Sequence, residues 1–373
     1  MGEHSVVYGR PALVSAIDLR LTARFTPSAS SGAGVRLELP GLGCEAETDW
    51  AEIRGYARGA RERWDGYAAS PDPRSFRALR GEDPVHLVKV ALGEAAEYLD
   101  TSVQTRAEGN VETGDGPGMT LRIDSDLPLG SGFGSSAAAA AAVVAGYLML
   151  RGAAADLATV ERLVHEVERR QHGTPSGVDA ATVLRGGLLW AVRPPSPDPG
   201  GRPLALEAVA VRSPALGRLA VVDTGAPAEP TGVVVAAVRE RLARERAVTE
   251  RLLDRMAEAT AAFRAGLEDE RGDAVALRDR LAEFEGCLEA LGVVPPPVAA
   301  IVRRIEAAGG AAKVSGAGAL SGRGAGALLV YHPEAALQPG PEAACRDLFP
   351  FLAALPVHPV RFGAAGLRRE ASR

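Results

Sequence analysis

A glycine-rich segment at residues 128–136 (PLGSGFGSS) lies between a short strand-like run at 119–123 and an alanine-rich helical run at 137–150. Its glycines remove side chains where backbone N–H groups must approach a bulky anionic group. Two serines stand at the expected helix start, where free N–H groups and the helix dipole favour phosphate. The sequence therefore predicts a phosphate-binding loop formed by Pro128, Gly130, Ser131, Gly132, Gly134, Ser135 and Ser136.

This loop differs from the two commonest nucleotide-binding loops. A P-loop requires a lysine between its last glycine and its Ser/Thr, and none is present at that place. A dinucleotide fingerprint requires a later strand that ends in an acidic residue at the spacing of a ribose contact, and no such strand follows. Another nucleotide-binding scheme is expected.

Length and composition limit the class of protein. The 373 residues suffice for two domains, and 46% hydrophobic and 24% charged residues are ordinary for a globular protein. A net charge of −5 argues against a nucleic-acid partner. The apolar run at 137–150 is shorter than the roughly 20 residues of a membrane span, and the polar start is not a secretory signal. Three widely separated cysteines fit a reducing cytoplasm, and neither zinc nor disulfides are expected.

Apolar periodicity predicts helices over 84–99 and 157–170, a partly helical insertion over 50–78 and strands within 6–25. The second half alternates strands and helices, as in an α+β sandwich. Its expected strands are 186–190, 219–224, 312–315, 327–331 and 357–362, and its expected helices are 233–260, 271–291, 297–308 and 342–355. The Pro- and Gly-rich stretch 194–203 marks the expected boundary between domains 1–195 and 196–373.

Two further segments accompany the glycine loop, GEHSVVYGRPAL at 2–13 and ERRQHGTPSGVD at 168–179. Together the three resemble the GHMP kinases, and within that superfamily the first and last look most like mevalonate kinase. The resemblance extends from residue 1 to about 331. It implies a two-domain α+β architecture: an N-terminal domain like ribosomal protein S5 domain 2, a ferredoxin-like C-terminal domain, and nucleotide in the cleft between them.

The resemblance also implies a function. The expected reaction is the ATP- and Mg²⁺-dependent phosphorylation of mevalonate to 5-phosphomevalonate, in isoprenoid precursor biosynthesis in the cytoplasm. A homodimer is compatible with it. The alternatives are another GHMP small-molecule kinase, acting on phosphomevalonate, homoserine or a sugar, and a non-catalytic metabolite-binding member.

Mg²⁺ prefers a few hard oxygen ligands. In mevalonate kinases the second serine of the glycine loop and the glutamate eleven residues before the HGxPSGxD aspartate hold the metal, and Ser136 and Glu168 match these positions. The alternative for Glu168 is a solvent-facing carboxylate among Arg162, Arg169 and Arg170.

Asp179 follows a Pro-Ser-Gly turn that would direct it into a cleft. We expect its carboxylate to accept a hydrogen bond, and the proton, from the substrate hydroxyl. The alternative is a helix N-cap, since a short helix can begin at Ala180.

The resemblance places six residues at the substrate, and two neighbouring segments depart from the family pattern. The family's third glycine motif continues K-x-[ST]-G-A-G with further glycines, whereas 319–320 read Ala-Leu here and a second glycine-rich turn follows. The segment 228–230 (AEP) stands where the family has a basic residue before Ser/Thr. The six expected substrate-binding residues are Glu3, His4, His172, Thr231, Gly316 and Ala317.

Lysine is scarce, with only Lys89 and Lys313 against 40 arginines. Family members carry a strand reading A-P-G-K before the GEH segment, and its lysine is expected to pair with the equivalent of Asp179. Here Met1 directly precedes Gly2, and neither lysine can be assigned to that role. We expect the sequence to begin at an internal methionine of a longer protein; a true truncation and a degenerate kinase are the alternatives.

Overall fold

The computed structural model describes residues 1–28, 34–70, 76, 79, 82–105, 116–128, 130, 132–194, 204–335, 337 and 340–370, without the side chains of 103–105. By their contacts they form two compact units made of separated stretches of chain. Unit 1 consists of Met1–Asp18, Pro128–Phe133 and Arg185–Arg368, and unit 2 of Leu19–Leu127, Gly134–Leu184 and the residues from Arg369. The first residues belong to unit 1 because β1 (Ala12–Ser15) pairs with β6 (Leu188–Val192). The domain boundary at 195 stays a prediction.

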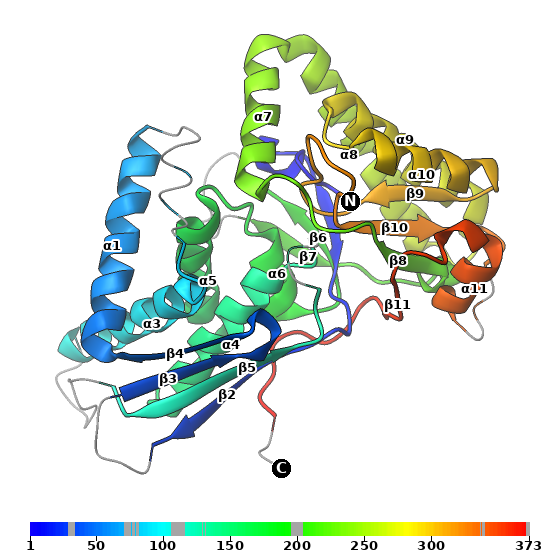
Figure 1. Cartoon of the computed structure of the whole chain (residues 1–373). Helices are drawn as coiled ribbons and strands as arrows, with labels where there is room; N and C mark the ends of the chain where they lie inside the picture. Colours follow the sequence, from blue (N-terminus) through cyan, green and yellow to red (C-terminus); the bar gives the residue numbers. More distant parts are fainter. Residues whose placement is uncertain are drawn as a thin grey trace. The chain divides into compact units, whose positions relative to one another are not determined.

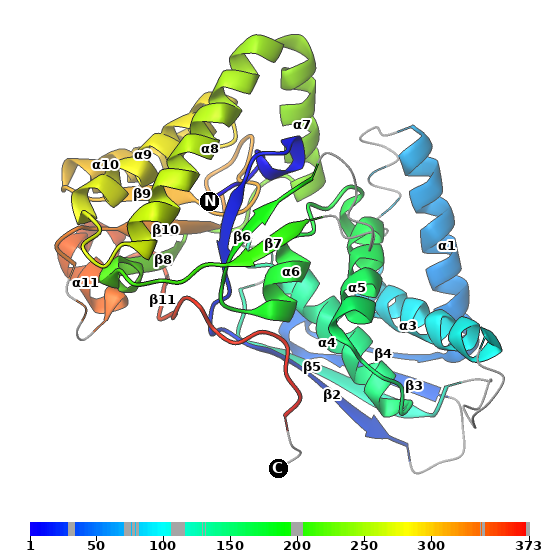
Figure 2. The ribbon, with the colours of Figure 1, turned by 180° about the vertical axis from the view of Figure 1, so that it is seen from behind.

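Unit 2 is a four-stranded sheet with helices on one face (Figures 1 and 2). The strand order is β2 (Leu21–Pro27), β5 (Met119–Ser125), β3 (Gly34–Leu39) and β4 (Cys44–Asp49), with β3 and β5 parallel and the other pairs antiparallel. Every second residue of β3 and β5 is buried, so one face packs against the helices and the other stays polar. The helices are α1 (Trp50–Ala69), α3 (His86–Thr105), α4 (Ser135–Leu150), α5 (Leu157–His172) and α6 (Val178–Arg185).

Unit 1 contains two sheets. One is the antiparallel sheet β1-β6-β7, in which β7 is Ala205–Ala208. The other has the order β11 (Val357–His358), β8 (Leu219–Asp223), β10 (Ala327–Tyr331), β9 (Ala311–Val314), and is antiparallel throughout. Strands β8, β9 and β10 are buried almost completely because helices pack against the sheet (Figure 1). The helices are α7 (Thr231–Arg244), α8 (Arg246–Glu268), α9 (Ala274–Leu291), α10 (Pro296–Ala307) and α11 (Pro341–Leu348).

Most predicted elements are confirmed, including the apolar face of α5, where Val160, Leu163, Val164 and Val167 are buried. The prediction of a single helix over 233–260 is wrong. Glu245 has a non-helical backbone (φ −127°, ψ 48°), and the chain turns there so that α7 packs back on α8. The helix expected over 342–355 ends at Leu348 and is followed by a short 3₁₀ turn at Pro350–Leu352, because proline cannot continue the hydrogen-bond ladder. None of the described helices is long and apolar enough to cross a membrane.

The contact between α1 and α3 predicts a site that does not tolerate a side chain. A Cβ on Gly93 would stand 2.3 Å from the Cβ of Ala57, which is far inside van der Waals contact. We expect Gly93→Ala to lower the free energy of unfolding by about 1–3 kcal/mol, the usual cost of overpacking. Gly55→Ala is the matched control: it lies in α1 with no atom near its Cβ position, and should raise stability by about 0.5–1 kcal/mol. Urea unfolding of both variants measures the difference, and equal effects would contradict the tight contact.

Glu285 of α9 predicts a pH dependence of stability. It has no exposed surface, it accepts a hydrogen bond from the Val314 N–H at 2.9 Å, and burial raises its pKa from 4.5 to about 7. Between these values the folded protein holds a proton that the unfolded chain has lost. The free energy of unfolding therefore falls as pH rises from about 4.5 to 7, by up to about 3 kcal/mol from this group.

The variant Glu285→Gln stays neutral, so it should lose this part of the pH dependence and be more stable than wild type at pH 8. Glu283→Gln removes a carboxylate that pairs with Arg280 on the same helix, and serves as the control. Chemical unfolding between pH 4.5 and 8 provides the measurement. A wild-type pH profile retained in Glu285→Gln would show that the buried carboxylate is not its source.

Candidate active site

The start of α4 differs from the starts of other helices in unit 2. Asp49 and Asp156 cap α1 and α5 by accepting hydrogen bonds from backbone N–H groups. The cap of α4 is Gly134, at φ 69°, which has no side chain to accept from the first turn. The cap residue therefore leaves the first N–H groups of this helix as donors for an anion.

The preceding part of the glycine loop packs within unit 1. A Cβ on Gly132 would stand 2.8 Å from the carbonyl oxygen of Ser315, so only glycine permits this approach to the third glycine motif. Gly130 has a positive φ of 72° and forms a turn. Pro128 is described beside it, whereas predicted Ser131 lies outside the described residues.

Ser136, Glu168 and His172 come together in unit 2. The Ser136 Oγ and the His172 Nε2 are 3.0 Å apart, and this nitrogen is 3.8 Å from the Glu168 Oε2. Glu168 is only 4% exposed, and its Oε1 has no hydrogen-bond partner in the described part of the chain. Burial raises the pKa of Glu168 to about 7, although the hydrogen bond with Ser136 opposes the shift. The result is a buried carboxylate oxygen beside a hydroxyl, with one oxygen available to a ligand.

The alternative interpretation of Glu168 as a solvent-facing carboxylate is wrong. The side chain is buried, and the neighbouring arginines have other partners. Arg169 and Arg170 both pair with Glu166, at 2.9 and 2.6 Å, and Arg162 lies over an aromatic ring. Glu168 is thus not part of a charged helix surface.

Asp179 lies in the first turn of α6, one residue after the helix begins. The turn before it is held by Ser176, whose Oγ accepts from the Val178 N–H at 3.2 Å. The N-cap alternative for Asp179 therefore does not describe this helix start. Its side chain lies against the beginning of α4, since its Cβ, Cγ and Oδ1 are 3.7, 3.8 and 4.0 Å from where a Cβ on Gly134 would stand.

In unit 1 the GEH segment is attached to the third glycine motif by a buried ion pair. The Lys313 Nζ donates to the Glu3 Oε1 at 2.6 Å, and Lys313 has no exposed surface. Burial alone would raise the pKa of Glu3, but the charge of Lys313 and the Met1 amine lower it to about 2. Glu3 is therefore ionised at neutral pH.

His4 makes the second connection. In the described part of the chain it is the one non-glycine residue with a positive φ, 58°. Residues other than glycine seldom adopt this backbone conformation. Its Nε2 is 2.9 Å from the carbonyl oxygen of Ala317, which can only accept, so this nitrogen carries the hydrogen. Burial lowers the pKa of His4 and keeps the ring neutral. The strained backbone thus aims a donor at the motif that contains Gly316 and Ala317.

The predicted residues therefore fall into two groups, one in each unit. Gly134, Ser135, Ser136, Glu168, His172 and Asp179 belong to unit 2; Glu3, His4, Pro128, Gly130, Gly132, Gly316, Ala317 and Thr231 belong to unit 1. Thr231 begins α7, is exposed, and its side chain has no hydrogen-bond partner among the described residues. The scarcity of lysine drew attention to Lys313, but no pattern in the sequence pointed to Glu3 as its partner.

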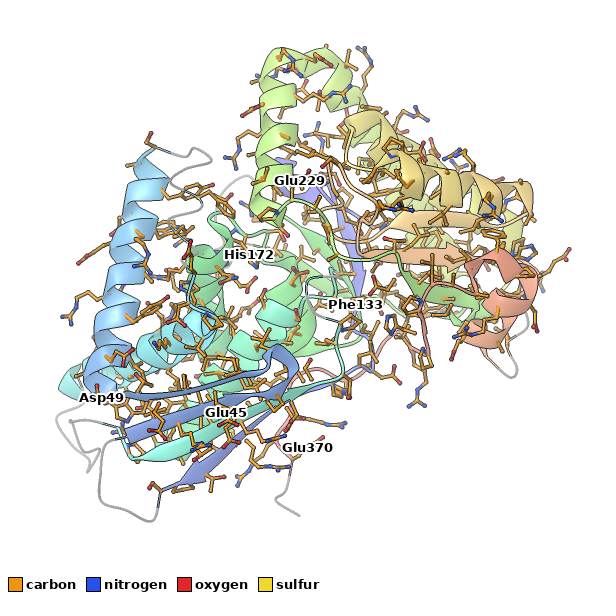
Figure 3. All side chains as sticks on the ribbon, in the orientation of Figure 1. Glu45, Asp49, Phe133, His172, Glu229 and Glu370 are labelled. Carbon is orange, nitrogen blue, oxygen red and sulfur yellow. The ribbon has the colours of Figure 1, made fainter. Side chains whose placement is uncertain are left out.

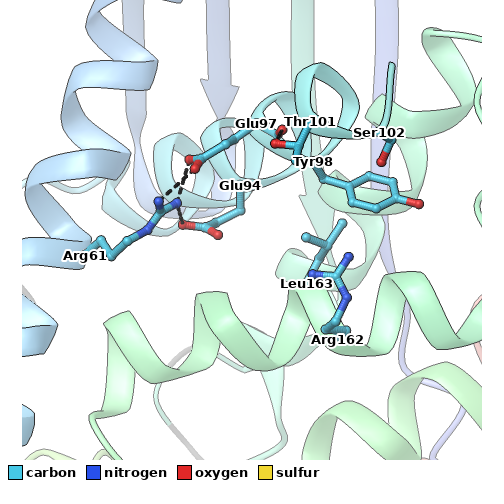
Figure 4. Close-up of a pocket in the computed structure, with 8 residues that line it drawn as sticks. All are labelled: Arg61, Glu94, Glu97, Tyr98, Thr101, Ser102, Arg162 and Leu163. Atoms are coloured by element: carbon cyan, nitrogen blue, oxygen red, sulfur yellow. Dashed lines mark hydrogen bonds and ion pairs between the residues drawn. The ribbon is translucent and has the colours of Figure 1, made fainter. Parts of the chain in front are cut away.

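Two other features carry less weight for catalysis. Lys89 donates to Glu52 and Asp83 at 2.8 and 3.0 Å within unit 2, so its charge is already paired. A surface pocket, shown in Figure 4, is lined by Arg61, Glu94, Glu97, Tyr98, Thr101, Ser102, Arg162 and Leu163. Arg61 donates to two of these glutamates, and none of the predicted site residues lines this pocket.

Residues 91–187 match the family model described as GHMP kinases N terminal domain. Mevalonate kinase from Thermococcus sibiricus is 29% identical over 191 residues, 51% of this chain and 47% of that enzyme. Human mevalonate kinase is 28% identical over 260 residues, 65% of this chain and 60% of the enzyme. For the Aeropyrum pernix mevalonate kinase the values are 29% over 325 residues, 85% and 82%. The chain thus spans about half to three fifths of the length of the first two relatives.

Solved structures agree on the fold. An L. major mevalonate kinase in complex with R-mevalonate has a TM-score of 0.65 at 20% identity, covering 98% of this chain and 93% of that one. A Streptococcus pneumoniae phosphomevalonate kinase in complex with phosphomevalonate and AMPPNP has a TM-score of 0.66 at 15% identity, covering 97% and 96%. The expected two-domain GHMP kinase architecture is confirmed, while such equal similarity to two kinases does not select an acceptor. Through its matching family model over residues 91–187 and its sequence relatives, the chain is similar to the GHMP kinases, and to the mevalonate kinases in particular.

Proposed function

We propose that the protein is an ATP-dependent kinase that phosphorylates the primary alcohol of mevalonate to form 5-phosphomevalonate, a step in isoprenoid precursor biosynthesis. One observation carries the proposal: the Asp179 side chain lies against the start of α4, where the cap residue is a glycine that leaves the first N–H groups to a phosphate. Sequence similarity to three mevalonate kinases supports mevalonate as the acceptor.

The residues of unit 2 fit Mg²⁺. Glu168 offers a buried carboxylate oxygen without a hydrogen-bond partner in the described part of the chain, and Ser136 offers a hydroxyl beside it. No group of three or more His, Cys, Asp or Glu side chains suited to a metal occurs among the described residues, which agrees with an ion held by few protein ligands and by nucleotide phosphates. When bound, Mg²⁺ would neutralise charge on the phosphates. His172 would hold the Ser136 hydroxyl in place.

Asp179 would orient the acceptor. Its carboxylate accepts the hydrogen bond of the substrate hydroxyl and takes the proton as the new oxygen–phosphorus bond forms and the bond to the leaving ADP oxygen breaks. The N–H groups of Ser135 and Ser136 would donate to phosphate oxygens. In unit 1, the His4 ring is held by the Ala317 carbonyl, and the family resemblance assigns Glu3, His4 and Ala317 to substrate binding.

A screen of acceptors tests the substrate assignment. With ATP and Mg²⁺ in a coupled ADP assay, we expect kcat/KM to be higher for mevalonate than for phosphomevalonate, homoserine, galactose or glycero-manno-heptose. A higher value for any of the others would replace mevalonate as the acceptor. ATP binding without turnover of any acceptor would instead support the non-catalytic alternative.

Two variants separate metal binding from proton transfer. Asp179→Ala should lower kcat at least about 100-fold, the contribution of a positioned base, while ATP affinity stays within about threefold. Glu168→Gln should raise the Mg²⁺ concentration for half-maximal activity at least about tenfold. Asp65→Ala, an exposed carboxylate of α1, is the control and should leave both values unchanged. Near-wild-type kcat in Asp179→Ala would remove that residue from the chemistry.

A further inference from the structure

The two segments that depart from the GHMP pattern contact each other in unit 1. The Glu229 carboxylate accepts hydrogen bonds from the backbone N–H groups of Leu320 and Ser321, at 2.9 and 3.3 Å. The Ser321 hydroxyl donates to the other oxygen of the same carboxylate. Glu229 lies two residues before α7, and its position is shown in Figure 3. The unusual acidic residue and the inserted glycine turn therefore form one structural feature.

The inserted turn is fixed at both ends as well. At its beginning the Ala319 N–H donates to the Val293 carbonyl at 2.9 Å. At its end the Thr224 hydroxyl accepts from the Ala325 N–H at 2.9 Å and donates to the Gly326 carbonyl at 2.7 Å. Between these anchors the backbone of Gly322 and Gly324 lies against residues 224–228, and the Glu229 carboxylate is the side chain that hydrogen-bonds the turn among the described residues.

Glu229 also introduces a charge. Partial burial would raise the pKa of its carboxyl, but the hydrogen bonds from Ser321 and Leu320 lower it overall, so the group is ionised at neutral pH. It forms no salt bridge with any described residue. The family pattern has a basic residue in this segment, so the sign of the charge is reversed.

The location connects this feature to the acceptor. The inserted turn continues directly from Gly316 and Ala317, and Ala317 is held by His4. At the other side, Glu229 precedes Thr231, which the family resemblance places near the substrate. A change in the attachment of the turn would reach both segments that are expected to contact the acceptor.

We propose that Glu229 and Ser321 form a clasp that fixes the inserted turn, and that the negative charge of Glu229 disfavours acceptors that carry a phosphate group. Only the effect of the Glu229 charge on acceptor choice rests on the proposed kinase function. The attachment of the turn can be tested without any activity.

Limited trypsin digestion tests the attachment. Arg323 is exposed at the tip of the turn, so release of the turn exposes the bond between Arg323 and Gly324. In Glu229→Ala, which loses all three hydrogen bonds of the carboxylate, we expect cleavage at this bond to be at least about tenfold faster, since even one charge-assisted hydrogen bond contributes that much. Ser321→Ala should accelerate it less. The control is Glu250→Ala, which removes an exposed partner of Arg246 on α8 and should leave this cleavage unchanged.

The fragment that begins at Gly324, identified by mass spectrometry, reports this bond and no other. Thermal unfolding of each variant separates local release from global destabilisation. Equal cleavage rates in wild type and Glu229→Ala, at similar unfolding temperatures, would overturn the clasp.

Kinetics test the role in acceptor choice. Glu229→Gln retains a hydrogen-bond acceptor but loses the charge. We expect the ratio of kcat/KM for mevalonate over phosphomevalonate to fall by about fivefold, the effect of one partly screened charge, with KM for ATP unchanged. Ser321→Ala retains the charge and should keep the ratio. An active enzyme whose ratio is the same in Glu229→Gln would overturn the specificity role. A wild type that phosphorylates no acceptor would refute the proposed function and with it this role, whereas the digestion still decides the clasp.

Discussion

The ammonium of Lys313 has no exposed surface, and a charge in that position is tolerated only with a charged, hydrogen-bonded partner. Glu3 supplies it from the other end of the chain, 310 residues away. Removing one member of such a buried pair typically costs about 3–5 kcal/mol, so the first residues are tied firmly to β9. The hydrogen bond between His4 and Ala317 follows from this attachment, because it joins the next residue of the segment to the loop after β9.

In unit 2 the candidate site depends on polar groups that the protein itself leaves without a hydrogen-bond partner among the described residues. An aspartate cap at the start of α4 would satisfy the N–H groups that an anion needs, as Asp49 does for α1. Gly134, at a φ of 69° that favours glycine, has no side chain to satisfy them. Glu168 likewise leaves a polar group without a partner within the described chain, in this case a hydrogen-bond acceptor. Burial raises its pKa and leaves one oxygen without a partner in the described residues, an arrangement that costs stability and suits a site completed by a cation.

Two departures from the family pattern are far apart in the sequence but contact each other in the structure. The acidic residue at 229 and the turn after Gly318 are separate anomalies in the sequence, about 90 residues apart. In the folded chain the Glu229 carboxylate accepts hydrogen bonds from backbone N–H groups of the inserted turn, so the two changes form one structural feature. Both lie next in sequence to residues expected at the acceptor, which is why we assign them a shared role in specificity.

Local patterns in the sequence determined much of this protein. Strand–loop–helix order around residues 119–150 and the apolar face of α5 were predicted from periodicity and glycine positions, which act over a few neighbours. The GHMP fold and most of the candidate residues were implied by the resemblance of the three motifs to the family. Whether α7 and α8 are one helix depended on packing between them, and nothing in the residues near Glu245 revealed it. The partners of Lys313, Glu168 and Glu229 were likewise decided only by the tertiary structure, since a buried charge or an unsatisfied carboxylate takes its partner from whatever the fold brings within hydrogen-bonding distance.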